Sequence, residues 1–265
     1  MEAKPYDILT LTHQGKRATQ EDRYVTKRLS RSNMTLNGIF DGHGGDGVAT
    51  LCRAEMPALI DQAIATHASA DIPKALHLAH SLMDAKCDAM PDVGSTSSLA
   101  IVDDNQKRMV FANCGDSMAL IVYLDGSHRL MSQEHKVQNE LERIQKAGGL
   151  VCYQYDGQPR LLNSLILSRA IGDHGYHPWV IPDPHVEVVE ATECDRVFAI
   201  VNATDGLWDV LTPEEVAGIV NKYSRIYQRR TCLKQLVGAA ITKGTRDNTT
   251  VSLIYPNRHK ADPTT

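Results

Sequence analysis

The motif Asp41–Gly45 carries the residue types and spacing best suited to chemistry in this chain. It follows an apolar segment, 36–40, which we expect to be a buried strand that delivers a carboxylate to its end, where glycines allow a bend. An aspartate at that point can hold a hard cation, and His43, two residues later, can transfer a proton.

Two further aspartates stand in similar places. Asp205 follows the apolar run 197–201, and Asp247 opens the last apolar strand. An Asp before Gly is often only a turn residue, so Asp41 alone leaves a turn and a site equally open. Carboxylates that converge from several strands hold magnesium or manganese far better than one isolated carboxylate. The ordered set therefore predicts an oxygen-ligand binuclear metal site that hydrolyses phosphate esters.

Composition narrows the classes of function. The chain has 265 residues, is 42% hydrophobic and 23% charged, and has a net charge of -4. These values are typical of a globular protein with a sizeable core and weigh against nucleic acid as the main partner. Six scattered cysteines without a CxxC pair favour reduced thiols. With no apolar signal or membrane segment in view, we expect a cytoplasmic or nuclear protein without membrane contact, and a monomer by default.

Periodicity predicts the elements that must position these residues. A helix should follow Gly45, with a kink or break at Pro57, and Thr212 and Glu215 should form a capping box. Other helices are expected at 73–90, 137–147 and 232–242. Strands are expected at 6–12, 22–28, 34–40, 97–102, 108–113, 118–123, 161–167, 185–189, 197–201 and 249–255.

The strands fall into antiparallel blocks, with the helices collected in two places. That order predicts an α+β fold of two packed sheets with helices outside them, and excludes an alternating βαβ order. No shift of composition marks a boundary. We therefore expect one domain over residues 1–255 and a polar C-terminal tail over 256–265.

Eight short motifs in order resemble those of the metal-dependent serine/threonine protein phosphatases of type 2C. They span roughly residues 8 to 255, and together they are far more specific than any one of them. The matching segments are Gly15–Arg17 with Glu21–Asp22, Phe40–Gly45, Gly94–Thr96, Asn113–Ser117, Arg143–Ile144 with Ala147–Gly149, Ser168–Asp173, Asp205–Asp209 and Asp247–Asn248.

The resemblance implies a four-layer α-β-β-α sandwich with two Mn2+ or Mg2+ ions and phosphorylated proteins as substrates. Asp41 would bridge both ions, and Asp205 and Asp247 would complete one of them. Glu21 and the Gly42 carbonyl would serve the other ion. The remaining implied roles are water orientation for Asp22 and a weaker third ion for Asp116 and Asp209.

Such a site would act through charge. Two cations that share a water lower its pKa enough to give a nucleophile near neutral pH, which attacks phosphorus without a covalent intermediate. Arg17 can hold two phosphoryl oxygens with its planar fork. The serine or threonine alkoxide is a poor leaving group, and His43 is placed to protonate it.

Departures from the family pattern leave the predicted ligands intact. Met118 stands where arginine is usual, Glu134 where aspartate is common and Thr204 where cysteine is frequent. Met118 and Glu134 lie where they can alter the surroundings of the third ion or the nearby packing. The alternatives are an inactive phosphoprotein-binding scaffold, which loss of metal acids would mark, and a small phosphate-ester hydrolase or nuclease. A nuclease is disfavoured by the lack of a basic stripe, and substrate profiling distinguishes the small-ester hydrolase.

Two histidine pairs complete the candidates. His174 and His177 have the spacing of a metal pair, but their proline-flanked loop favours a structural role or a place at the substrate rim. His77 and His80 share one helix face and are interpreted as surface or packing residues.

Overall fold

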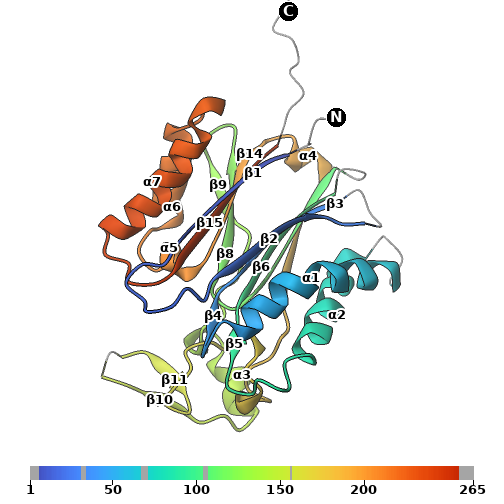
Figure 1. Ribbon diagram of the computed structural model, residues 1–265, viewed down its shortest axis with the longest axis vertical. Coiled ribbons are helices and arrows are strands. Elements are labelled where there is room, and N and C mark those ends of the chain that lie inside the picture. Colours follow the sequence, from blue (N-terminus) through green and yellow to red (C-terminus); the bar gives the residue numbers. More distant parts are fainter. Residues whose placement is uncertain (1–5, 31–33, 67–70, 104–106, 156, 257–265) are drawn as a thin grey trace, which may run out of the picture.

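The computed structural model describes residues 6–30, 34–66, 71–103, 107–155 and 157–256. Two five-stranded antiparallel sheets pack face to face, with helices on both outer faces (Figure 1). The predicted α+β four-layer sandwich is confirmed. The first sheet has the order β1 (Tyr6–His13), β15 (Thr249–Pro256), β14 (Val197–Ala203), β8 (Met118–Tyr123) and β9 (His128–Leu130). The second has the order β13 (His185–Val189), β7 (Arg108–Cys114), β6 (Ser97–Asp103), β3 (Met34–Phe40) and β2 (Arg23–Arg28).

Four longer helices form the outer layers (Figure 1). Helices α1 (Gly47–Thr66) and α2 (Ile72–Asp84) cover the second sheet. Helices α6 (Pro213–Lys222) and α7 (Arg229–Thr242) cover the first. The shorter helical segments are α3 (Leu141–Lys146), α4 (Ala191–Cys194), α5 (Asp205–Trp208), η1 (Val137–Asn139), η2 (His174–Tyr176) and η3 (Ile226–Gln228).

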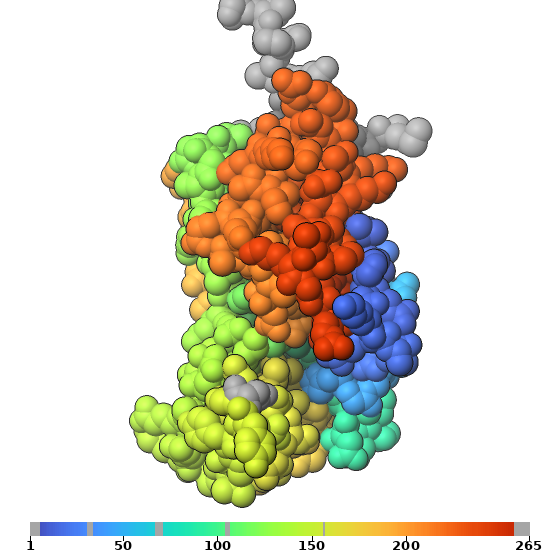
Figure 2. Space-filling model, turned by 90° about the vertical axis from the view of Figure 1, so that its left-hand side faces the viewer, coloured from blue at the N-terminus to red at the C-terminus, as the bar shows by residue number. Residues whose placement is uncertain are grey.

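Two small sheets lie at one end of the sandwich. A three-stranded sheet has the order β12 (Ile171–Gly172), β5 (Gly94–Ser95) and β4 (Gly42–His43). The hairpin β10 (Val151–Tyr153) and β11 (Pro159–Leu161) projects beside α3. Figure 2 shows this segment in yellow-green below the orange-to-red surface of the C-terminal helices.

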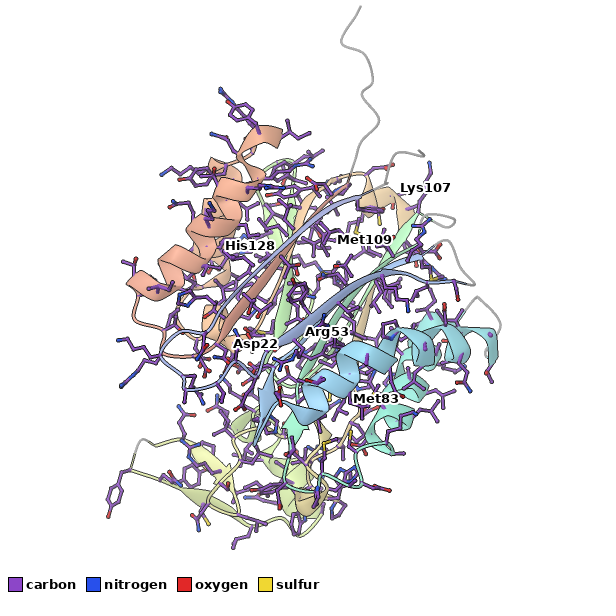
Figure 3. All side chains as sticks on the ribbon, viewed as in Figure 1. Asp22, Arg53, Met83, Lys107, Met109 and His128 are labelled. Atoms are coloured by element: carbon purple, nitrogen blue, oxygen red, sulfur yellow. The ribbon has the colours of Figure 1, made fainter. Side chains whose placement is uncertain are left out.

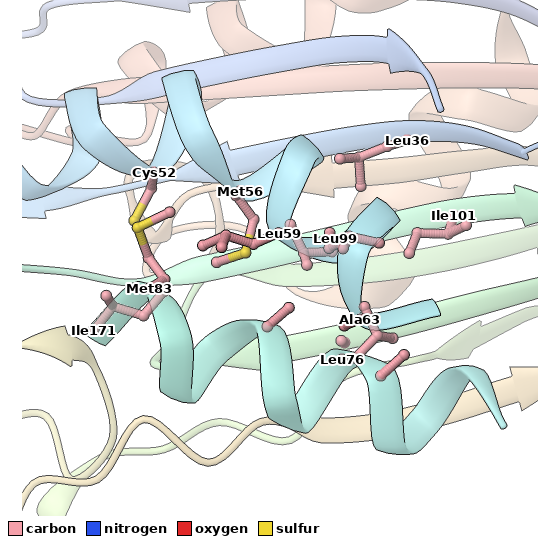
Figure 4. Close-up of a cluster of buried hydrophobic side chains, with 14 of the residues drawn as sticks. Leu36, Cys52, Met56, Leu59, Ala63, Leu76, Met83, Leu99, Ile101 and Ile171 are labelled. Atoms are coloured by element: carbon pink, nitrogen blue, oxygen red, sulfur yellow. The ribbon is translucent and has the colours of Figure 1, made fainter. Parts of the chain in front are cut away.

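Side-chain alternation builds the hydrophobic layers. In β6, Leu99 and Ile101 face the helices, whereas Ala100 and Val102 face the other sheet. Because both faces are covered, the whole strand is buried and apolar along most of its length. Figure 4 shows the helix-facing layer, in which Met56 and Leu76 from the two helices meet the strand residues.

Several local expectations are wrong. Pro57 does not break α1, which runs continuously through it. The second helix ends at Asp84 and not near residue 90. The segment 161–167 is not a strand beyond Leu161, because Leu162 and Asn163 adopt left-handed backbone conformations with φ of 50° and 61°. The helix over 137–147 is divided into η1 and α3 at Glu140, whose φ is -128°.

Two other expectations hold, the capping box and the unpaired cysteines. Thr212 and Glu215 form the predicted capping box at the start of α6. All six cysteines are free, and four of them are buried. No helix among the described residues combines the length and the apolar character needed to cross a bilayer. Residues 257–265 of the expected tail lie outside the described residues.

Candidate active site

Asp41 lies at the junction between β3 and β4, as the apolar strand before it predicted. Thr96 holds its backbone from both sides: the Asp41 N–H donates to Thr96 Oγ1 at 3.2 Å, and its carbonyl accepts from the Thr96 N–H at 2.9 Å. Thr96 is itself hydrogen-bonded to Ser117 at 2.6 Å. Asp41 is therefore held in place by the β5–β6 connection, which contains Thr96, and through it by the β7–β8 connection, which contains Ser117.

Asp205 is the first residue of α5, directly after β14. The next residue must be glycine, because a Cβ at Gly206 would lie 2.0 Å from the Asn248 carbonyl oxygen. Because Gly206 has no side chain, the start of α5 packs directly against the segment that contains Asp247. Asp205 and Asp247, distant in sequence, are thus brought to the same end of the first sheet.

Asp22 lies between the two sheets, as Figure 3 shows. Thr204 and Thr250 each donate a hydroxyl hydrogen bond to its Oδ2, at 3.1 and 2.7 Å. Its other oxygen, Oδ1, is buried and has no hydrogen-bond donor within the described part of the chain, and the same holds for Oδ1 of Asp205. Two orphaned carboxylate oxygens in one place are what a cation site requires.

The crowding of these acids alters their pKa values. The carboxylate of Asp41 is repelled by the neighbouring carboxylates of Asp205, Asp22 and Asp116. Desolvation, followed by repulsion from neighbouring carboxylates, raises the pKa of Asp41 and Asp205 well above the usual range. Desolvation likewise raises the pKa of Asp22 to about 6, against the threonine hydrogen bonds that lower it. Divalent cations would relieve this repulsion.

The loop before β2 supplies Arg17 and Glu21. Arg17 donates to Asp247 Oδ2 at 2.5 Å, and its side chain is 60% exposed. Asn248 anchors the loop: its Nδ2 donates to the carbonyls of Gln14 and Thr19, and its Oδ1 accepts from the Glu21 N–H at 2.7 Å. Asn248 had been noted only as part of a motif, because its role depends on a contact across the whole chain.

Gly42 fits tightly beneath this loop. A Cβ there would lie 2.8 Å from the Glu21 carbonyl oxygen and 3.1 Å from Ala49 Cβ. A glycine is therefore required for Glu21 and the Gly42 backbone to lie side by side.

His43 is held by Asp173, with 2.6 Å between Nε2 and Oδ2. The three-stranded sheet makes this pair, since β5 lies between His43 on β4 and Gly172 on β12. Gly94 leaves room for it, because a Cβ there would lie 2.4 Å from both bonded atoms. Asp173 closes a motif noted in the sequence, but its contact with His43 was not predicted.

Asp116 and Asp209 lie around Lys136, 3.8 and 3.0 Å from its ammonium nitrogen, and Glu134 is 3.0 Å away. Burial lowers the pKa of Lys136, but the carboxylates of Asp116 and Asp209 raise it more, so the lysine stays charged. Desolvation raises the pKa of Asp116 to about 6 although Lys136 lowers it. In this structure, a lysine cation satisfies the acids that were expected to hold a third ion.

A pocket of about 160 Å³ unites the predicted residues. Leu165, Ile166 and Leu167, from the segment after β11, also line it, which the strand expected at 161–167 does not predict. The pocket thus has an acidic floor and an apolar side. The predicted residues that line it are Arg17, Glu21, Asp41, Gly42, His43, Asp116, Asp205 and Asp247. Asp22 lies behind them, and Asp209 lies at the side, on Lys136.

Comparison with known proteins agrees with this arrangement. The family model for Protein phosphatase 2C matches residues 10–249. The chain belongs to the protein phosphatase 2C family. Protein phosphatase 2C 3 of Arabidopsis thaliana is 32% identical over 258 residues, which cover 87% of this chain and 55% of the relative. Protein phosphatase 1L of Bos taurus is 26% identical, with 98% of this chain and 76% of the relative covered.

Solved structures are similar in fold as well. A sex determining protein of C. elegans superimposes with a TM-score of 0.87 at 21% identity, covering 97% of this chain and 66% of that one. Serine-threonine phosphatase 2C of Toxoplasma gondii gives 0.77 at 20% identity, covering 94% of each chain. These likenesses concern the fold. The chain spans about half the length of several Arabidopsis thaliana relatives that it matches.

Proposed function

We propose that this chain is a metal-dependent phosphatase that removes phosphate from phosphoserine and phosphothreonine in proteins. The observation that carries the proposal is the convergence of Asp41, Asp205 and Asp247 on one pocket that Arg17 and His43 also line. Asp22 lies behind these residues. Family membership supports the same reaction class.

The donors at the pocket floor are all oxygens, which suits Mn2+ or Mg2+. Asp41 would lie between two ions, with Asp205 and Asp247 on one and Glu21 and the Gly42 carbonyl on the other. The orphaned Oδ1 of Asp205 and the raised pKa of Asp41 support this fit. When bound, such ions lower the pKa of a coordinated water and offset the charge of the phosphoryl oxygens.

The remaining residues bind and orient the substrate. Arg17 lies at the exposed rim, where its guanidinium can exchange the Asp247 carboxylate for two phosphoryl oxygens. Two threonine hydroxyls fix Oδ2 of Asp22 and leave its buried Oδ1 without a donor among the described residues, and this oxygen would orient water.

His43 would protonate the departing serine or threonine oxygen. Its Nε2 is engaged by Asp173, and its Nδ1 has no partner among the described residues. A doubly protonated ring can therefore deliver a proton from Nδ1 while Asp173 keeps the ring in place. A departing alkoxide needs this proton, whereas an aryl oxide does not.

Hydrolysis of a phosphothreonine peptide with and without Mn2+ or Mg2+ tests the proposal. Asp205→Asn should abolish most turnover while the protein stays folded, because it removes a charge from the metal ligands. Asp125→Asn, in the β8–β9 turn where Asp125 bonds Ser127, is the matched control and should leave turnover unchanged. Full turnover in excess chelator would refute the metal requirement. Turnover of small phosphate esters without any peptide turnover would favour the ester hydrolase.

A further inference from the structure

Three potential metal ligands converge at the C-terminal end of α2, on residues that the proposed phosphatase site does not use. Asp84 Oδ2 lies 3.3 Å from His174 Nε2 and 3.9 Å from His177 Nε2. One potential ligand atom from each of the three residues lies within 4.8 Å of the other two. Asp84 ends α2, His174 begins η2 and His177 follows it, so the cluster joins two separate elements.

The separations suit a shared cation better than direct hydrogen bonds. Elsewhere in the chain, His43 and His77 approach their aspartates to 2.6 and 2.7 Å. The cluster's contacts are longer, and both imidazoles approach the same carboxylate oxygen. Ligand atoms about 2.1 Å from a tetrahedral zinc ion lie about 3.4 Å from one another, close to these values.

Hydrogen bonds from neighbouring groups orient His174 and Asp84, as they orient the ligands of protein metal centres. Asp88 Oδ1 lies 3.0 Å from His174 Nδ1, so it can accept a hydrogen bond from the Nδ1–H group and leave the Nε2 lone pair for the ion. Asp84 is 8% exposed, and its second oxygen, Oδ1, accepts from the Gly172 N–H at 2.8 Å. Hydrogen bonds from ligands to such outer partners are characteristic of protein metal centres.

The framework behind the cluster is rigid. Figure 4 shows Met83, the neighbour of Asp84, close to Ile171, the neighbour of Gly172, and both belong to the same buried hydrophobic cluster. His177 is the most open of the three, with its side chain 34% exposed, whereas those of His174 and Asp84 are 15% and 11% exposed. An ion can therefore approach the cluster from the side of His177.

We propose that Asp84, His174 and His177 bind a divalent ion of the zinc class, with water completing the coordination. Imidazole nitrogen favours zinc, whereas the all-oxygen set of the phosphatase pocket favours magnesium or manganese. The site is therefore separate in both place and metal preference. Because η2 begins directly after Asp173, the ion would tie the segment that holds His43 to the end of α2.

Zinc titration followed by calorimetry tests this site, in excess Mg2+ so that the acidic pocket is filled. One tight equivalent is expected in the unaltered chain and in His77→Ala, a control that removes a histidine of α2 facing Asp183. His174→Gln, His177→Gln and Asp84→Asn should each lose that equivalent, and thermal unfolding would show that they remain folded. Asp88→Asn should weaken binding by about 10- to 100-fold.

Cobalt gives a second readout, since its visible absorption reports nitrogen ligands directly. The absorption should persist in Asp205→Asn, which alters the other metal site, and disappear in His174→Gln. Zinc should also slow hydrogen exchange of residues 173–177. The proposal is overturned if the unaltered chain binds no zinc, if the cluster variants bind it unchanged, or if Asp205→Asn removes it.

Discussion

The hydrogen bond between His43 and Asp173 allows a quantitative test of proton delivery. The carboxylate side chain of Asp173 is 2% exposed and lies 2.6 Å from the imidazole. A hydrogen bond to a charged group contributes about 1.5–3 kcal/mol. If His43 is protonated in the reaction, Asp173→Asn should lower kcat/KM for a phosphothreonine peptide by about 10- to 150-fold.

Asparagine is suited to this position. Asp173 has a left-handed backbone with φ of 54°, which asparagine tolerates well. Its backbone N–H bond to the Val93 carbonyl does not involve the side chain. The substitution therefore removes the charge while the local fold is preserved.

The assay compares the phosphopeptide with an aryl phosphate, whose leaving group needs little protonation. The loss should be much smaller for the aryl substrate. Asp183→Asn is the matched control, because Asp183 pairs with His77 at 2.7 Å outside the pocket, and it should leave both activities unchanged. Equal losses for both substrates after Asp173→Asn, or no loss for either, would refute proton delivery by His43.

Two further changes test how the fold supports the site. Burial lowers the pKa of His80 to about 4, so the unfolded chain binds its proton more readily and stability falls as the pH drops below 6.5, levelling off below 4. In urea unfolding, His80 should lower the free energy of unfolding by about 2 kcal/mol at pH 5 relative to pH 8. If His80→Gln shows an equally steep pH dependence, His80 is not its cause. Gly206→Ala should lower the free energy of unfolding by about 1–3 kcal/mol or more and impair metal binding, because the added Cβ would collide with the Asn248 carbonyl. Gly218 on α6 has open space around it, so Gly218→Ala should stabilise the fold by about 0.5–1 kcal/mol. Urea unfolding measures both glycine variants, and equal effects of the two would show that the close approach at Gly206 is unimportant.

Local sequence patterns determined much of the fold. The strands 34–40, 118–123 and 185–189 have the bounds that alternation and turn residues predicted. The capping box of α6 was equally readable. Such features depend on side-chain periodicity and on backbone preferences within a few residues, which a single sequence displays directly.

Where tertiary packing opposes a local backbone preference, the sequence gives a wrong expectation. Pro57 is accommodated within α1, whose buried residues on both sides of it hold the helix together. Tertiary contacts outweigh the local signal there. For His80 the sequence left a surface and a packing role open, and the structure decides for packing: the ring is fully buried between the Leu76 carbonyl and the Ser97 hydroxyl, at 2.8 and 3.2 Å.

For the site, the sequence by itself determined which acids stand at strand ends, because Asp41 and Asp205 follow apolar runs and Asp247 precedes one. Only the tertiary structure decided their partners: Asp173 on His43, Lys136 between Asp116 and Asp209, and Asp84 facing two histidines of another segment. Each of these contacts joins residues far apart in the chain. Their geometry follows from how sheets and helices pack, and no local pattern encodes that packing.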